Sequence, residues 1–280
     1  MLLPRPMTLP ELVRLTLAED VGMGDVTTLA TVSPLARGRA RVYAKEPIVV
    51  SGQAAAAEVF AQLGCEYAMV VADGGRADPA QGEGTLAWVE GPLQGLLTGE
   101  RAALNFLMRL SGVATHVSRV VALAPNLRIV DTRKTTPLLR ALEKAAVRDG
   151  GGGNHRFGLF DGVMIKDNHI VAAGGIAAAV ARARATIQPL LRVEVEVESI
   201  DELREAIAAG ADDVLLDNMD DGMLEEAVRV AAGRVRLEVS GGVTPERLPR
   251  LAALGVDRVS MGGLIHQARW VDLSLRIQPL

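Results

Sequence analysis

The chain has 280 residues, of which 49% are hydrophobic, 23% are charged and only 3% are aromatic, and its formal net charge at pH 7 is −4. This composition is typical of a globular protein of one or two domains, with a core made mainly of Leu, Val, Ile and Ala. The acidic balance argues against a nucleic-acid-binding protein. The most apolar run, 171–181, is too short and too interrupted by glycine to span a membrane.

A cytoplasmic location is expected from two further features. Cys65 is the single cysteine, so no disulfide can form within the chain, which favours a reducing compartment. The first fifteen residues, MLLPRPMTLPELVRL, lack the long apolar segment and small-residue cleavage site of a signal peptide.

The first third of the chain is predicted to form an α+β domain. Thr8 and Glu11 have the spacing of a capping box and predict the start of a helix. Four strand candidates and one helix follow, at 39–44, 48–50, 67–71, 85–89 and 54–63. Strands with few helices between them indicate a mostly antiparallel sheet.

A helix over 98–111 is expected to join two domains, because it has an apolar stripe and an opposite polar stripe. The polar stripe holds Arg101, Asn105 and Arg109. From Leu127 onward, short apolar segments alternate with helical ones. The six strand candidates are 128–130, 163–165, 191–197, 214–216, 235–239 and 258–260, and the later helices are 200–209, 224–231 and 245–253. Such an array predicts right-handed crossovers in a (β/α) barrel, with function at the carboxyl ends of the strands.

The segment 131–170 concentrates the basic residues of the chain. It contains Arg133, Lys134, Arg140, Lys144, Arg148, Arg156 and Lys166. Two apolar strands run directly into charge, at DTRK and at KDNH, and predict one anion-binding site built from strand ends. Any single one of these cations could be an ordinary surface charge, and the i+4 spacing of Arg140, Lys144 and Arg148 fits a solvated helix face equally well.

Within this segment, Gly150–Gly153 leads directly into Asn154, His155 and Arg156, which indicates a close approach of backbone to a ligand. His155 and His169 could each serve a structural or a functional role. The histidines and the cysteine show no spacing typical of a zinc site.

Carboxylates on two neighbouring strands suggest a divalent cation. Glu194 and Glu196 alternate with valines and therefore point to one face, and Asp217 ends the next strand. Glu196 with Asp217 would suit Mg²⁺ held together with substrate phosphates. A salt bridge from Glu196 to Lys134 or Lys166 is the alternative. The glycine loops SGG and MGG after the last two strands predict a phosphate site.

Taken together, the motifs resemble those of the quinolinate phosphoribosyltransferase family. The matching stretches are GDVTT, GERAALNFLMRLSGVAT, DTRKTTPLLR, AVRDGGGGNHRFGLFDGVMIKDNHI, EVEVES, LLDNM, EVSGGVT and VDLSLRI. The resemblance covers nearly the whole chain. It implies an incomplete (β/α) barrel at 111–270 preceded by an α+β N-terminal domain at 1–110, to which the tail 271–280 returns.

The resemblance also implies a reaction. Phosphoribosyl pyrophosphate and quinolinate would give nicotinate mononucleotide, pyrophosphate and CO₂ in de novo NAD biosynthesis, with Mg²⁺ as cofactor. Rivals are a relative of the same fold acting on another base, a non-catalytic sensor of phosphoribosyl ligands, and a barrel isomerase acting on a sugar phosphate.

The family's site residues can be transferred position by position. Around the pyridine dicarboxylate the resemblance places Arg133, His155, Arg156 and Lys166. Around the ribose, pyrophosphate and Mg²⁺ it places Lys134, Glu196 and Asp217, with Thr132 also in the substrate-binding set. At the 5′-phosphate it places Ser240, Gly241, Gly242, Met261, Gly262 and Gly263. Lys134, Lys166, Glu196 and Asp217 are the expected catalytic residues, and Glu196 and Asp217 the expected metal ligands.

The resemblance further implies a homodimer with shared active sites, in which Arg101 is donated by the partner subunit; assembly beyond a dimer is left open. No nucleic-acid or membrane partner is expected. Asp149, Met261 and Ile265 depart from the family's pattern and are expected to bear on substrate affinity and not on the reaction.

Overall fold

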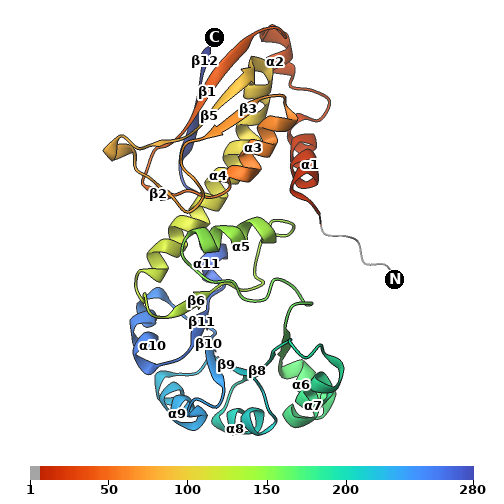
Figure 1. The fold of residues 1–280 in the computed structure, drawn as a ribbon, viewed down its shortest axis with the longest axis vertical. Helices are drawn as coiled ribbons and strands as arrows, with labels where there is room; N and C mark the ends of the chain where they lie inside the picture. The colour runs from red at the N-terminus through yellow and green to blue at the C-terminus, as the bar shows by residue number, and fades with distance from the viewer. Residues whose placement is uncertain (1–6) are drawn as a thin grey trace. The chain divides into compact units, whose positions relative to one another are not determined.

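The computed structural model describes residues 7–280; the first six, part of the stretch judged to lack a signal peptide, lie outside the described residues. The chain forms two compact units (Figure 1). Unit 1 contains the residues up to Ser118, together with Thr136–Gly151 and Gln267–Leu280, and unit 2 contains Arg119–Thr135 and Gly152–His266. The division differs from the predicted boundaries chiefly at 136–151, which were assigned to the barrel domain and belong to unit 1.

Unit 1 is built on an antiparallel sheet of four strands in the order β12-β1-β5-β3. The strands are β1 (Arg37–Ala44), β3 (Glu66–Met69), β5 (Thr85–Pro92) and β12 (Leu273–Pro279), and β2 (Ile48–Val49) pairs separately with β4 (Arg76–Ala77). Alternate residues of β1 are buried, among them Ala40 and Val42. One face of the sheet therefore packs on the core, as the alternation in the sequence predicts.

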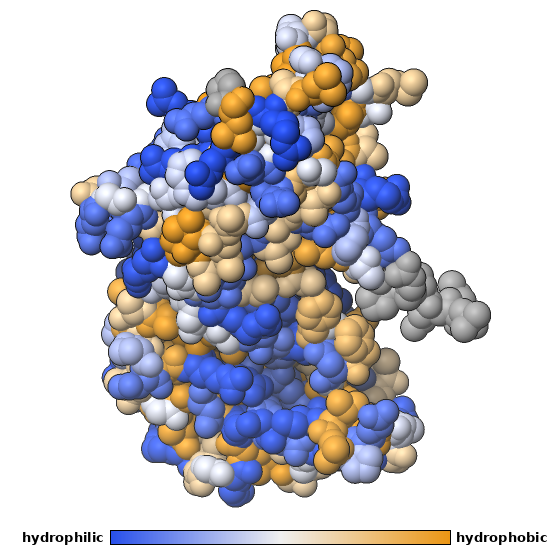
Figure 2. Space-filling model, turned by 45° about the horizontal axis from the view of Figure 1, so that its top comes forward, coloured by the Kyte–Doolittle hydropathy of each residue, from blue (hydrophilic) through white to orange (hydrophobic). Residues whose placement is uncertain are grey.

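The helices of unit 1 begin with α1 (Leu9–Val21), whose predicted capping box between Thr8 and Glu11 is confirmed. The others are α2 (Val26–Thr31), α3 (Gln53–Gln62), the 3₁₀ turn η1 (Pro79–Gln81), α4 (Leu93–Val121) and α5 (Arg140–Asp149). In the described residues, no helix combines the length and the apolar character that a membrane crossing requires. The face drawn in Figure 2 mixes hydrophilic with apolar residues.

Helix α5 belongs to unit 1 because its inner face is tied to α4. Arg109 forms an ion pair of 2.7 Å with Glu143, which is fully buried, and also donates to the carbonyl of Ala268. Lys144 is only 1% exposed. The solvated-face interpretation of Arg140, Lys144 and Arg148 is thus wrong for Lys144. Arg109 is half-buried and is a structural partner of Glu143, and not part of an outward polar stripe.

Unit 2 contains a parallel sheet of six strands in the order β6-β11-β10-β9-β8-β7. They are β6 (Arg128–Val130), β7 (Val163–Ile165), β8 (Val193–Val197), β9 (Asp213–Asp217), β10 (Arg236–Ser240) and β11 (Arg258–Ser260). All six predicted strands are present, and with the sheet of unit 1 they confirm the predicted fold class. Because β6 and β7 are the two edges of the sheet, the barrel is incomplete.

Helices separate the strands of unit 2 and lie outside the arc that the strands form (Figure 1). They are α6 (Asp167–Ala173), α7 (Ile176–Thr186), α8 (Ile200–Ala208), α9 (Asp221–Ala231), the 3₁₀ turn η2 (Pro245–Arg247), α10 (Leu248–Leu254) and α11 (Gly263–His266). Helices α6 and α7 were not predicted. The run 171–181, which contains the end of α6 and the start of α7, is apolar and interrupted by glycine, so no polar positions mark a helical period there.

The tail of the chain is held in unit 1 by a strand and by a close backbone contact. Strand β12 pairs with β1 along seven residues, from Gly38 opposite Pro279 to Ala44 opposite Leu273. Just before it, the chain passes directly over α4 at Gly112, where an added Cβ would lie 2.2 Å from the carbonyl oxygen of Arg269. Only glycine lets the two backbones approach this closely.

We predict that Gly112→Ala destabilises the protein. The greater helix propensity of alanine by itself would stabilise the folded state by about 1 kcal/mol. The clash with the Arg269 backbone outweighs this gain, because overpacking that displaces side chains and backbone costs roughly 1–3 kcal/mol and occasionally more. Thermal unfolding should show a melting temperature lower by a few degrees. Gly222→Ala in α9 is the control, since its nearest neighbour is the Asp220 side chain at 3.4 Å; equal melting temperatures for both variants would contradict the prediction.

Candidate active site

Alternate residues of the unit 2 strands point into the barrel and surround a cavity of about 650 Å³ at the carboxyl ends of the strands. The opposite-facing valines of β8, Val193, Val195 and Val197, are buried in the core. The cavity is lined by Thr132, Arg133, Lys134, His155, Arg156, Met164, Lys166, Glu196, Leu215, Asp217, Asn218, Glu238, Ser240, Gly241, Gly242 and Ser260. The wall is therefore dominated by charged and polar groups.

Most of the predicted site residues meet in this cavity. They are Thr132, Arg133, Lys134, His155, Arg156, Lys166, Glu196, Asp217, Ser240, Gly241 and Gly242. The ammonium of Lys166, at the end of β7, forms an ion pair with the carboxylate of Glu196 on β8. That pair was the alternative interpretation of Glu196, and its presence at the cavity wall is compatible with binding of a charged ligand.

Four predicted residues do not line the cavity. Arg101 lies in unit 1, exposed on α4. The side chain of Met261 is buried, and its amide donates to the carbonyl of Val130 at 2.9 Å, so it continues the pairing of β11 with β6. Gly262 lies under Lys134, since an added Cβ would be 2.9 Å from Lys134 Cδ. Gly263 begins α11.

The segment that follows the glycine run is fastened to the edge of the sheet at β6. Gly153 pairs with Val130 in a parallel bridge. The buried carboxylate of Asp131 accepts hydrogen bonds from the amide of His155 at 2.9 Å and from the side chain of Asn154 at 2.7 Å. Asp131 therefore fixes the point at which His155 and Arg156 enter the cavity.

The His155 ring is held at both nitrogens. Its Nε2 lies 3.2 Å from Glu194 and 3.4 Å from Glu238, and its Nδ1 accepts the Arg156 amide hydrogen at 2.7 Å. In the neutral ring the proton is therefore on Nε2. Burial by itself lowers the pKa of His155, but hydrogen bonds and charge from the two carboxylates outweigh it and raise the pKa to about 9. A charged ring carries a proton on Nδ1 as well and cannot accept the Arg156 amide there, so this contact belongs to the neutral ring.

Two guanidinium groups share the same region of the cavity. Arg156 donates to the carbonyl of Gly162 at 3.4 Å and to the sulfur of Met164 at 3.6 Å. Burial first, and then the neighbouring charge of Arg133, lower the pKa of Arg156. Like charges placed side by side repel each other, so their arrangement favours an anion between them.

The glycine loop after β10 approaches the loop after β9 closely. Gly241 has φ +81°, and an added Cβ would lie 2.3 Å from Asn218 Oδ1 and 2.9 Å from the Asn218 amide nitrogen. Asn218 itself has φ +54° and donates its amide to Ser240. Glycine is needed at 241 for both its conformation and the available space.

Glu196 and Asp217 have the ligand atoms and the position that a Mg²⁺ site requires. Both line the cavity on neighbouring parallel strands and offer only oxygen atoms. Two carboxylates supply less than a full coordination shell, so substrate oxygens and water would complete it. A different trio, His155, Glu194 and Glu238, brings its ligand atoms within 4.8 Å of one another. The guanidinium of Arg258 already pairs with both of its carboxylates, which leaves little need for a metal there.

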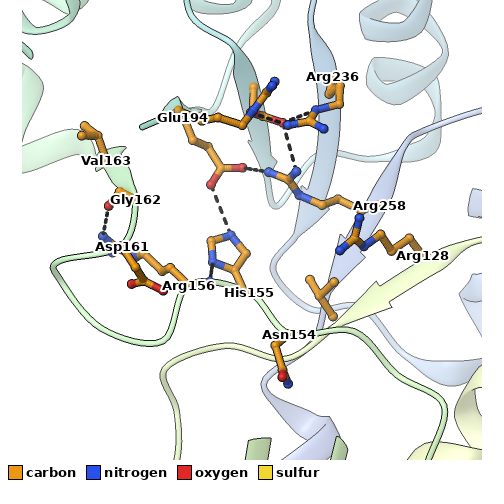
Figure 3. A pocket seen from close by; sticks show the side chains of 13 residues that line it. Arg128, Asn154, His155, Arg156, Asp161, Gly162, Val163, Glu194, Arg236 and Arg258 are labelled. Carbon is orange, nitrogen blue, oxygen red and sulfur yellow. Dashed lines mark hydrogen bonds and ion pairs between the residues drawn. The ribbon is translucent and has the colours of Figure 1, made fainter. Parts of the chain in front are cut away.

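A second, smaller cavity of about 240 Å³ lies at the amino ends of the same strands (Figure 3). Its wall contains four arginines that begin or precede strands, Arg128, Arg192, Arg236 and Arg258. Three of them pair with Asp213, which is 2% exposed. Burial raises the pKa of Asp213, but the arginines outweigh that effect and lower it.

Sequence reasoning missed several residues that shape the site. They are Asp131, Asp213, Glu238 and Arg258, together with the cavity-lining Met164, Leu215, Asn218 and Ser260. The alternation that drew attention to Glu194 and Glu196 also occurs in β10, as Arg236, Glu238 and Ser240, and would have identified Glu238 as inward-facing.

The three departures from the family's pattern have structural explanations. Asp149 lies in unit 1 and accepts a hydrogen bond of 2.6 Å from the hydroxyl of Ser51. Met261 and Ile265 are both buried, at 6% and 1% exposure. Their larger size is therefore accommodated in the core.

Comparison with known proteins is consistent along the whole chain. Residues 25–111 match the family model described as quinolinate phosphoribosyl transferase, N-terminal domain, and residues 113–276 match that of the C-terminal domain. A probable nicotinate-nucleotide pyrophosphorylase [carboxylating] of Bacillus subtilis is 40% identical over 92% of this chain and 90% of its own. The human nicotinate-nucleotide pyrophosphorylase [carboxylating] is 39% identical over 99% of this chain and 94% of its own.

Solved structures give the same result. The nicotinate-nucleotide pyrophosphorylase of Francisella tularensis superposes with a TM-score of 0.90 at 39% identity, covering 96% of both chains. Matches to both domain models, at this identity and coverage, leave one assignment. The chain belongs to the quinolinate phosphoribosyltransferase family.

Proposed function

We infer that the protein is a decarboxylating phosphoribosyltransferase of NAD biosynthesis, which converts quinolinate and phosphoribosyl pyrophosphate into nicotinate mononucleotide, pyrophosphate and CO₂. The observation that carries this function is the cavity of unit 2, where a cation cluster, two oxygen ligands and a glycine loop face one another. A transferase for a doubly charged base and a diphosphate needs all three.

We propose that the cation cluster binds the two carboxylates of quinolinate. Arg133 and Arg156 can each form two parallel hydrogen bonds to a carboxylate, and a charged His155 adds a third positive group. Lys166, which pairs with Glu196 in this structure, can turn toward the substrate. A site for a neutral or monoanionic base would not need so much positive charge.

Phosphoribosyl pyrophosphate would occupy the opposite part of the cavity. Ser240, Gly241 and Gly242 offer backbone amides to the 5′-phosphate. Lys134, Glu196 and Asp217 surround the place where pyrophosphate departs, and Mg²⁺ held there would neutralise the charge that develops on its oxygens. Lys134 supplies positive charge at the same place from the chain itself.

Transfer would precede decarboxylation. Loss of the 2-carboxylate leaves an electron pair on carbon beside the ring nitrogen. Once the nitrogen carries the ribosyl group it is cationic and stabilises that electron pair until the carbon takes up a proton from solvent, which gives nicotinate mononucleotide. The cations around the carboxylates therefore serve mainly to bind and orient quinolinate.

We also propose a homodimer with shared active sites and a cytoplasmic location. Exposed apolar side chains around α2, including Met23, Val26, Leu29 and Leu35, give unit 1 a surface suited to association. Arg101 is exposed on α4 and available to a partner's cavity. The single cysteine supports a reducing compartment.

Purified protein should form nicotinate mononucleotide from quinolinate and phosphoribosyl pyrophosphate in the presence of Mg²⁺. Nicotinate, which lacks the 2-carboxylate, should be a far poorer substrate because half of the cation cluster is then unmatched. Chromatography of the products measures both reactions. Equal turnover of nicotinate would refute the assignment of substrate, and a chelator that leaves the rate unchanged would refute the metal.

Arg133→Lys should raise the KM for quinolinate about tenfold or more, because lysine keeps the charge but loses the paired hydrogen bonds. The KM for phosphoribosyl pyrophosphate should change little. Steady-state kinetics with each substrate varied in turn tests this, with Arg229→Lys on the exposed face of α9 as control. If both variants bind quinolinate like the wild type, Arg133 has another role.

A mixed dimer tests whether Arg101 acts in its partner's site. Arg101→Ala and Lys166→Ala subunits are each expected to be inactive alone. In a heterodimer of the two, one site carries both defects and the other carries neither. Random reassortment makes about half of the dimers mixed, so activity should return to roughly a quarter of the wild-type value. Absence of recovery after verified subunit exchange would assign Arg101 to its own subunit or to a structural role.

A further inference from the structure

Behind His155, on the side of the second cavity, lies a cluster of charges that the proposed substrate contacts do not use. Glu194 on β8 and Glu238 on β10 both approach Nε2 of the ring. Arg258 on β11 pairs with both carboxylates, at 2.6 Å to Glu194 and more closely to Glu238. Figure 3 shows His155 pointing toward Glu194, and Glu194 toward Arg258.

This arrangement is poorly explained by stability alone. Glu238 is fully buried, and in the part of the chain that the structure describes its Oε1 atom has no hydrogen-bond partner. A buried carboxylate oxygen without a donor is unfavourable, and buried ion clusters are often no more stable than apolar side chains of the same size. Glu238 also lines the larger cavity, next to His155. Its position therefore suggests a role in the site.

We propose that Glu238 and Arg258 are positioning residues for the transferase reaction, which fix the His155 ring and keep it positively charged at the wall of the quinolinate subsite. The proposal rests on the proposed function and deepens it. Arg258 orients the two carboxylates, and the carboxylates hold Nε2 of the ring. The charged ring then contributes positive charge to the subsite beside Arg133 and Arg156. Asp131 fixes the backbone at the same point.

Charged groups from several elements face or adjoin His155. They are Asp131 after β6, Glu194 on β8, Glu238 on β10, Arg258 on β11, and Arg156 on the same segment. Two carboxylates at one nitrogen favour the charged ring, so its pKa is raised to about 9. A raised pKa means that the positive charge is present at neutral pH and is lost as the pH rises through about 9.

The test is Glu238→Gln, which keeps the size of the side chain and an acceptor for Arg258 but removes one charge at His155. The KM for quinolinate should rise about fivefold or more, while kcat and the KM for phosphoribosyl pyrophosphate change less. The alkaline limb of kcat/KM for quinolinate should move to lower pH by about one unit, since one adjacent charge shifts a pKa by that much or more. Both substrate carboxylates stay ionised in this range, so the limb reports the enzyme.

Asp213→Asn is the matched control. Asp213 pairs with Arg258, Arg192 and Arg236 but is not among the groups that contact His155. It should lower thermal stability and leave the alkaline limb in place. A merely structural cluster would give the opposite pattern, with equal losses of stability and no shift of the limb in either variant. Should Glu238→Gln fail to fold, Glu194→Gln takes its place with the same expected shift.

A second readout separates this inference from the proposed function. NMR titration of the His155 ring, one of four histidines in the chain, needs no turnover. The pKa of the ring should lie well above that of an ordinary histidine in the wild type and fall in Glu238→Gln. An ordinary pKa in the wild type, or one unchanged by the substitution, overturns the positioning role even in an active enzyme. If the wild type is inactive but the pKa of His155 is raised and falls in Glu238→Gln, the proposed transferase function fails and the positioning of His155 stands.

Discussion

Buried charge inside the barrel must be paired, and this requirement organises unit 2. Ionised groups removed from water are unfavourable unless an opposite charge and hydrogen bonds replace the solvent. Asp213, Glu194 and Glu238 are all buried, at 2%, 5% and 0% exposure, and each pairs with Arg258. The strands thus carry inward-facing groups that stabilise one another from the amino ends toward the cavity.

The same pairing gives the cavity its polarity. Carboxylates and arginines pair with one another at the amino ends of the strands, and His155, Arg156 and Arg133 line the larger cavity. At the carboxyl ends of the strands, positive and negative side chains lie side by side. Lys166 forms an ion pair with Glu196, and Asp217 lies on the neighbouring strand. In our account a dianionic base binds to the cations and a diphosphate binds beside the carboxylates, with the metal between them. In this proposal the charges that line the cavity would separate the two anionic substrates.

Sequence patterns identified the strands and the residues at their ends well. Short apolar runs that end in charge are a local signal, and the six strands and most of the expected site residues were found from them. The contacts that support the site were harder to foresee. Arg258 and Asp213 lie 45 positions apart in the chain and meet only because β9 and β11 flank β10.

Helix α5 shows a different limit. Its i+4 cations look like a solvated face, yet Lys144 is buried, and Glu143 is held by Arg109 from another helix. Burial of that kind depends on tertiary packing, which periodicity does not report. Helices α6 and α7 were missed for the opposite reason, because the run 171–181 that contains the end of one and the start of the other has no polar residues to mark a period. Met261 was expected in a phosphate-binding loop, but its side chain is buried in the core. Its amide donates to Val130 of β6 and extends the pairing of the two strands.

The central claim is that phosphoribosyl transfer takes place in one cavity and that quinolinate loses its 2-carboxylate only after that transfer. Quinolinate carrying an isotopic label in that carboxylate tests it directly. Labelled CO₂ should appear only when phosphoribosyl pyrophosphate is present, in amounts equal to pyrophosphate and nicotinate mononucleotide. Release of labelled CO₂ without phosphoribosyl pyrophosphate, or a nucleotide that retains the label, would contradict the account.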